Sequence, residues 1–167
     1  HASSSAASDV YKRQLYMFGR EDTLQLGRGE DEGEAKASRA TSGPVPVPSL
    51  CGRVVAVALG ADHVCAIDTT GSLFSFGRGS FSQLGLGDTA DRASPTRVDG
   101  LSSAVVSVAC GWRFTLAVCT GGDVFSWGAG STGQLGHPSK LRRRVPTKIE
   151  ALAPDRLNGS HITSVSA

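Results

Sequence analysis

The chain carries an internal repeat, and a repeat of this kind restricts the possible folds more than any other feature of a sequence. A step in which an aromatic residue precedes glycine recurs 58 and 51 residues apart, at Gly19, Gly77 and Gly128. A Gln-Leu-Gly step recurs in phase with it at the same two spacings, at Gly27, Gly85 and Gly136. Two motifs that keep a constant offset from each other indicate one structural unit used about three times.

A third marker runs in phase with the first two. Val57–Gly60 and Val108–Gly111 both end in glycine and lie 51 residues apart, and Val165-Ser166-Ala167 matches the start of the same marker. The chain begins at His1 and ends inside this marker, so we expect a piece of a longer repeat protein. The repeated glycines, Gly60 and Gly111 included, are interpreted as structural positions that permit tight turns or close approach of neighbouring backbones.

Each unit reads as short strands separated by turns. Runs of four to six residues, such as 54–59, 64–67 and 73–76, are bounded by turn residues, and 105–110, 114–119 and 124–127 repeat the scheme. A fourth strand is expected near 96–98 in one unit and near 147–149 in the next. Four antiparallel strands in a unit of about 50 residues are typical of a β-propeller blade. The fold class predicted is therefore all-β, an incomplete ring of about three four-stranded blades.

The division along the chain follows from the repeat. Residues 1–14 align with no unit and read as a Ser/Ala-rich leader or linker, either native or foreign to the gene. The repeats cover approximately 15–72, 73–123 and 124–167. Between the Gln-Leu-Gly step and the next strand the units differ in length, and such variable loops are where partner specificity usually lies.

These motifs closely resemble the regulator of chromosome condensation repeat family. The resemblance is most complete at Trp127–Gly136 and at Val57–Ala66, and it covers 15–167. It implies blades of a seven-bladed propeller, in a family that includes exchange factors for a small nuclear GTPase, a plant ultraviolet-B photoreceptor, and domains of large ubiquitin ligases and kinases. The chain departs from the pattern at Thr23-Leu24, where a small residue and glycine are expected, and at Phe114, which stands where the other unit has His63.

Three surface segments are candidates for partner binding. Trp112-Arg113 follows Gly111 at the mouth of a strand and resembles the Gly-Trp-Arg units of the plant photoreceptor, which implies a chromophore or an interface charge. Arg142, Arg143 and Arg144 form the densest basic run, suited to an acidic protein surface or to phosphate, or else a solvated loop. Glu30, Asp31 and Glu32 make the insert of the first unit acidic.

Several classes of function lose support. A net charge of +2 gives no overall attraction to nucleic acid or anionic membrane, and the sequence has no apolar stretch long enough to span a bilayer. No histidine has an evident nucleophile as partner, and the Gly128–Gly133 match to a dinucleotide motif lacks a helix after it. The four cysteines lack zinc-site spacing, so we expect no metal and no cofactor.

The sequence therefore predicts a non-enzymatic, intracellular scaffold, cytoplasmic or nuclear, that binds a protein partner. Two alternatives remain open: a guanine nucleotide exchange factor for a small GTPase, and an ultraviolet-B receptor-like propeller. A contact with nucleic acid or chromatin is conceivable but has no support in the sequence.

Overall fold

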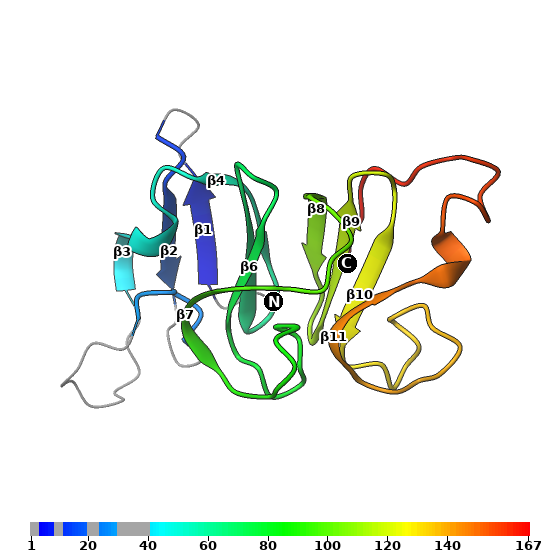
Figure 1. Ribbon diagram of the computed structural model, residues 1–167. Helices are drawn as coiled ribbons and strands as arrows, with labels where there is room; N and C mark the ends of the chain where they lie inside the picture. The colour runs from blue at the N-terminus through cyan, green and yellow to red at the C-terminus, as the bar shows by residue number, and fades with distance from the viewer. Residues whose placement is uncertain (1–3, 9–11, 20–23, 30–40) are drawn as a thin grey trace.

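The computed structural model describes residues 4–8, 12–19, 24–29 and 41–167, which form three antiparallel sheets lying side by side (Figure 1). Sheet A contains β1 (Ser4–Ser8), β2 (Leu15–Gly19) and β3 (Thr41–Pro46). Sheet B contains β4 (Val54–Leu59), β5 (His63–Asp68), β6 (Leu73–Gly77) and β7 (Arg92–Arg97). Sheet C contains β8 (Val105–Cys110), β9 (Phe114–Cys119), β10 (Val124–Gly128) and β11 (Arg143–Lys148).

Sheets B and C are two copies of one meander. Strand order follows chain order in both, and His63 pairs with Gly77 as Phe114 pairs with Gly128. The only helices among the described residues are the 3₁₀ turns η1 (Pro48–Leu50) and η2 (Glu150–Leu152), and none could span a membrane. The predicted architecture is therefore confirmed: the protein is all-β, and sheets B and C are four-stranded antiparallel blades in an arc that does not close, while the described part of sheet A has three strands.

The sheets differ in phase from the sequence repeats. Sheet B takes β4 and β5 from the first repeat and β6 and β7 from the second, because the glycine markers lie at strand ends and not between blades. In the segment that aligned with no repeat, Ser4–Ser8 pairs with Leu15–Gly19 as a strand of sheet A. Short hydroxyl-rich segments lack the β-branched and aromatic residues by which a strand is recognised in a sequence.

The fourth strand of each blade begins earlier than the sequence predicted. It spans Arg92–Arg97 and Arg143–Lys148, so the expected positions near 96–98 and 147–149 fall at its end. The strand was misplaced because a proline lies inside it, at Pro95 and Pro146, and proline is normally read as a break. Both strands are edge strands of their sheets, where proline is tolerated because its nitrogen needs no hydrogen-bond partner. Proline at an edge also discourages pairing with the edge of another sheet.

The core lies between neighbouring sheets. Phe76 is buried in a cluster with residues of sheet A such as Leu15 and Met17, and Trp127 is buried in a cluster with Ile67 and Leu73 of sheet B. In sheets B and C, the strand that carries the aromatic-glycine step therefore inserts its ring toward the preceding sheet. This is the packing expected of repeat units that bury their apolar faces against each other.

Candidate functional site

The β8–β9 turn, residues 111–113, is held in place by the aromatic-glycine step of its own blade. Gly128 has φ +102°, and a Cβ there would lie 2.5 Å from the carbonyl oxygen of Arg113. The close approach lets the Ala129 amide donate to that carbonyl at 2.9 Å. Gly77 has the same role in sheet B, where the Arg78 amide donates to the Asp62 carbonyl at 2.8 Å. The repeated glycine thus fixes the turn that carries Trp112 and Arg113.

The Gln-Leu-Gly step of one blade receives the aromatic ring of the next. A Cβ at Gly27 would lie 2.7 Å from the Phe76 ring, and one at Gly85 would lie 2.7 Å from Nε1 of Trp127. Both glycines also have positive φ, +67° and +75°. The serine between the two aromatics of the β6 strand points the other way, and Ser75 Oγ donates to the Leu84 carbonyl at 2.8 Å. The loop that carries Leu84 and Gly85 is therefore hydrogen-bonded to its own blade through Ser75 and is in contact with the Trp127 ring of the next blade.

The Gln83 carbonyl forms a buried polar link between sheets B and C. It accepts hydrogen bonds from Trp127 Nε1 and from Thr115 Oγ1, each at 2.9 Å. Thr115 Oγ1 also lies 2.9 Å from His63 Nε2, and both side chains are fully buried. The Thr115 hydroxyl donates its hydrogen bond to the Gln83 carbonyl, so it can only accept one from His63. Nε2 of His63 therefore carries a hydrogen and is the donor to Thr115 Oγ1. Burial lowers the pKa of His63 to about 4, so the ring is neutral at physiological pH.

An aromatic and basic surface forms where this turn meets the loops beside it. The Arg113 guanidinium lies 3.9 Å from the centre of the Phe81 ring and 4.7 Å from that of Trp112, while Arg142 lies 5.7 Å from Phe81. These distances are within the range of cation–π attraction. Trp112 is 68% exposed, so its indole is presented to solvent and not packed between blades. We call Phe81, Trp112, Arg113 and Arg142 the Trp112 surface.

The Trp112 surface borders a cavity of about 480 Å³ whose lining includes Ser131, Thr132, Gln134 and Lys140. Three lining residues are cationic, Arg113, Lys140 and Arg142, and the described residues that line it include no Asp or Glu. The equivalent turn of sheet B is different, because Asp62 there lies 3.6 Å from Arg78 and offsets its charge. The cavity is thus the place where exposed aromatic area and unbalanced positive charge coincide.

The structure separates the residues of the basic run. Arg142 reaches the cavity and donates to the Ser80 carbonyl at 3.3 Å. Arg143, at the start of β11, donates to Ser139 instead, and the exposed Arg144 uses its carbonyl to accept from the Gly87 amide. The acidic candidates Glu30, Asp31 and Glu32 lie outside the described residues. Partner binding by any of these residues stays a prediction.

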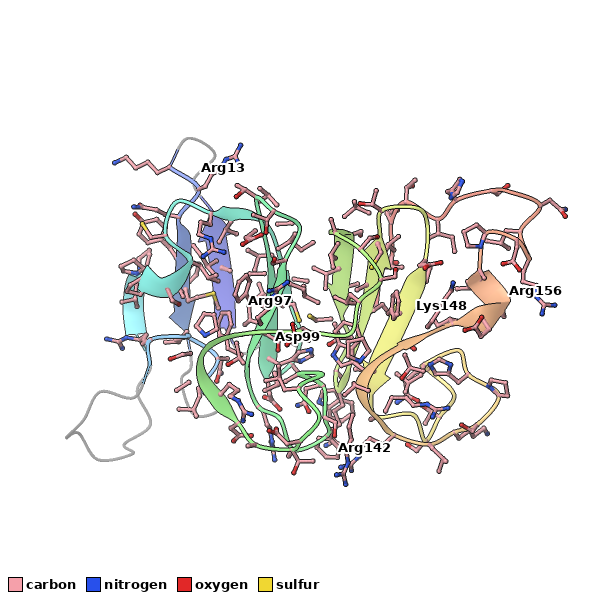
Figure 2. All side chains as sticks on the ribbon, viewed as in Figure 1. Arg13, Arg97, Asp99, Arg142, Lys148 and Arg156 are labelled. Atoms are coloured by element: carbon pink, nitrogen blue, oxygen red, sulfur yellow. The ribbon has the colours of Figure 1, made fainter. Side chains whose placement is uncertain are left out.

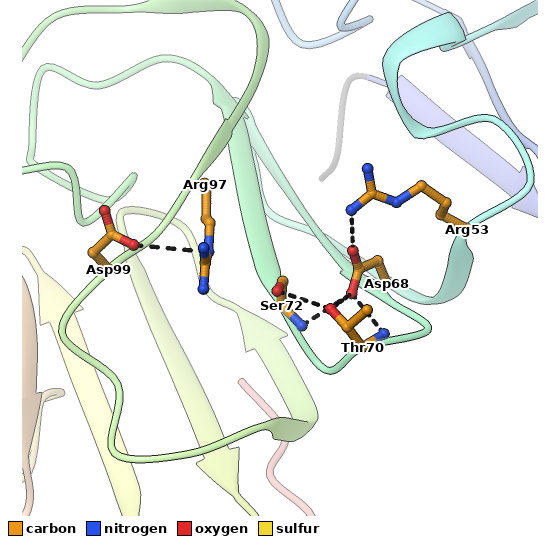
Figure 3. A network of polar contacts seen from close by, with 6 residues as sticks. All are labelled: Arg53, Asp68, Thr70, Ser72, Arg97 and Asp99. Atoms are coloured by element: carbon orange, nitrogen blue, oxygen red, sulfur yellow. Dashed lines mark hydrogen bonds and ion pairs between the residues drawn. The ribbon is translucent and has the colours of Figure 1, made fainter.

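The opposite ends of the strands carry a structural network (Figure 3). The buried Asp68 carboxylate accepts from the Thr70 amide at 2.8 Å, from the Thr70 hydroxyl at 2.6 Å and from the Ser72 amide at 3.0 Å, and it also pairs with Arg53. Burial raises the pKa of Asp68, but the hydrogen bonds from Thr70, Arg53 and Ser72 lower it by more, so the carboxylate stays ionised. This network closes the β5–β6 turn, and its hydrogen bonds occupy the Asp68 carboxylate.

Two features escaped the sequence analysis because they join distant segments. Phe81 contacts Arg113 from a loop of another sheet, and the aromatic residue in that loop gave no signal by itself. His63 and Cys65 of β5 lie close to Cys110 of β8, although no zinc-like spacing connects them. Gly128 ends β10, and the described residues after it, 129–140, form turns and contain no helix, as the sequence predicted.

Comparison with known proteins agrees with the repeat geometry. A model of the regulator of chromosome condensation (RCC1) repeat matches residues 14–67, 70–118 and 121–167, and a second model of this repeat matches 54–83 and 105–134. The chain is 36% identical over 156 residues to the ultraviolet-B receptor UVR8 of Arabidopsis thaliana, covering 92% of this chain and 34% of that protein. It is 37% identical over 155 residues to the probable E3 ubiquitin-protein ligase HERC3 of Homo sapiens, covering 92% of this chain and 14% of the ligase.

Solved structures show the same fold. Prp20p of Saccharomyces cerevisiae, in a study of its binding to Gsp1p and histones, superposes with a TM-score of 0.73 at 24% identity, over 89% of this chain and 36% of that one. Human WBSCR16 superposes with a TM-score of 0.68 at 27% identity, over 87% and 37%. The chain thus spans about a third or less of the length of these proteins. With three repeats matched in sequence and their sheets superposable on these structures, the chain belongs to the regulator of chromosome condensation (RCC1) repeat family.

Proposed function

We propose that this chain is part of a non-enzymatic protein-interaction module that binds an acidic segment of a partner protein at the Trp112 surface. The observation that carries the proposal is the coincidence of an exposed indole, two arginines and a cavity without carboxylates. Tryptophan and arginine are the residues that most often dominate the binding energy of interfaces. The aromatic rings hold the Arg113 guanidinium in position, so less side-chain conformational entropy is lost when a partner binds.

Acidic peptides are the natural probe for this surface. The exposed Trp112 reports on binding by fluorescence, whereas the buried Trp127 provides a constant background. We expect Glu/Asp-rich peptides that contain an aromatic residue to quench or shift this emission, and basic peptides of the same length to have no effect. Trp112→Ala and Arg113→Ala should each weaken binding by about 30-fold, which corresponds to about 2 kcal/mol for an interface hot spot.

Arg156→Ala is a matched control. Arg156 is also an exposed arginine, but it lies beyond η2 and far from Arg142 in Figure 2. Arg156→Ala changes the net charge as much as Arg113→Ala does, so a nonspecific charge effect would weaken binding equally in both variants. Equal losses, or no discrimination between acidic and basic peptides, would contradict the proposal.

The stacking of Arg113 on Trp112 also keeps the second alternative, ultraviolet-B sensing, in consideration, since one relative is named an ultraviolet-B receptor. The turn of sheet B offers Ala61 and Asp62 where Trp112 and Arg113 stand in sheet C, so sheet B repeats neither the chromophore nor the cation. A change in Trp112 emission or in oligomeric state after ultraviolet-B irradiation, absent from Trp112→Phe, would favour this alternative. Accelerated nucleotide release from a small GTPase would favour the exchange-factor alternative instead.

A further inference from the structure

Three soft metal-binding side chains converge at the interface between sheets B and C. His63 and Cys65 lie two residues apart on β5, on the face that packs against sheet C, and Cys110 ends β8. One ring nitrogen of His63 and the Sγ atoms of Cys65 and Cys110 all lie within 4.8 Å of one another. In the sequence, Cys110 lies 45 residues after Cys65 and 47 after His63, so only the packing of two blades brings the set together.

The hydrogen bonds of His63 leave one nitrogen able to bind a metal. Nε2 donates its proton to Thr115, as the bond from Thr115 to Gln83 requires. Nδ1 then keeps its lone pair, and although it is buried, no hydrogen-bond partner among the described residues reaches it. A buried polar atom without a partner is costly and calls for an explanation. Histidine ligands of metals characteristically donate their other ring N–H to a fixed acceptor, which is the arrangement seen at Thr115.

The chemistry of the three donors selects the ion. Two thiolates and an imidazole are soft to intermediate ligands, preferred by Zn²⁺ over Mg²⁺ or Ca²⁺. Two thiolates also balance the two positive charges of Zn²⁺, so the bound group would place no net charge in the interior. Cys110 is partly buried as a residue, but its thiol belongs to the buried donor set, and it donates to the Ala58 carbonyl at 3.6 Å.

We propose that His63, Cys65 and Cys110 form a zinc site that fastens sheet B to sheet C. On binding, each thiol loses its proton to solvent, two S–Zn bonds form, and a ring nitrogen of His63 donates its lone pair, so no oxidant or reductant is needed. The neighbouring A–B interface does not repeat the site, because Leu59 stands at the position equivalent to Cys110. The site is therefore particular to one pair of blades.

The test is metal binding by the reduced full chain. We expect one Zn²⁺ per chain by elemental analysis, and on replacement with Co²⁺ we expect the charge-transfer absorption of cobalt–thiolate bonds. Cys65→Ala and Cys110→Ala should weaken binding at least about 100-fold, since each removes a direct ligand, whereas loss of an outer partner costs about 10- to 100-fold. Thr115→Val should show that smaller loss, and Thr115→Ser, which keeps the hydroxyl, should restore affinity.

Cys119→Ala is the matched control, because Cys119 is buried in the same core cluster but is not one of the three donors. His63→Phe places in β5 the residue that β9 has at the equivalent position, so it should fold while losing the metal. If a cysteine variant fails to fold, the cobalt spectrum of the unaltered chain still decides, because it reports thiolate ligation directly. Absence of stoichiometric metal, or absence of the cobalt–thiolate band, would overturn the proposal.

Discussion

The contact between Gly85 and Trp127 offers the sharpest test of how one blade packs on the next. Gly85 has φ +75°, and an added Cβ would lie 2.7 Å from Nε1 and 3.0 Å from Cδ1 of the Trp127 indole. That indole is fully buried and bonded to the Gln83 carbonyl at 2.9 Å. Gly85→Ala therefore cannot be accommodated by rotation of a flexible side chain, and the two blades must separate or the indole must leave its position.

The expected magnitude has two parts. A left-handed backbone costs an L residue roughly 1–2 kcal/mol. Overpacking against a rigid ring adds about 1–3 kcal/mol, so Gly85→Ala should lower the free energy of unfolding by about 2–5 kcal/mol. Gly133→Ala separates the two parts, because Gly133 has φ +84° but a Cβ there would meet no atom within 4 Å. That variant should cost only the roughly 1–2 kcal/mol of the backbone.

Urea melts of four chains measure the coupling: the parent, Gly85→Ala, Trp127→Ala and the double variant. Trp127→Ala alone should cost about 3–5 kcal/mol, as for other large core aromatics. In the double variant the ring that collides with Ala at 85 is gone, so the coupling should be about 1–3 kcal/mol. Additive losses, or equal losses from Gly85→Ala and Gly133→Ala, would refute the claim that this glycine is needed for the ring of the next blade.

Three further perturbations test the buried polar groups. Burial lowers the pKa of His63 from 6.5 to about 4, so the unfolded chain takes up a proton at higher pH than the folded one. The free energy of unfolding of the metal-free chain should therefore be fully retained above about pH 6.5 and fall by about 3 kcal/mol as the pH drops to about 4. Ser75→Ala should cost about 1–3 kcal/mol because it leaves the buried Leu84 carbonyl without this donor. Asp68→Ala should cost about 1–3 kcal/mol through the unpaired amides of its turn, whereas Arg53→Ala, which removes a half-exposed partner, should cost under about 1 kcal/mol.

Each of these has a control and a contradicting outcome. His63→Phe should remove the pH dependence between about pH 4 and 6.5, and a slope that persists in this variant would assign it to another group. Exposed Ser94→Ala should leave the urea midpoint unchanged, and a loss as large as that of Ser75→Ala would show that the Leu84 bond is not what matters. If Arg53→Ala destabilises as much as Asp68→Ala, the ion pair and not the backbone amides holds the β5–β6 turn.

Much of a blade can be predicted from the sequence because its determinants are local. The alternation of Phe74, Ser75 and Phe76 places aromatics on one face and serine on the other, and tight turns need glycines such as Gly77. Such patterns depend only on the backbone period and on steric limits within a few residues. The position of the outer strand is not predictable in this way. Pro95 lies inside it, proline is acceptable only in an edge strand, and local patterns do not reveal which strand is the edge.

The contacts between blades were decided by the tertiary structure alone. His63 and Thr115 are 52 residues apart, and nothing near either residue indicates the other. Phe81 lies against Arg113, and Cys65 lies near Cys110, because two sheets meet at one particular angle and offset. That geometry is set by the summed packing of many side chains across an interface and by loops of variable length. The repeat thus determined the blade by itself, while the Trp112 surface and the histidine–cysteine cluster exist only where folding places two blades side by side.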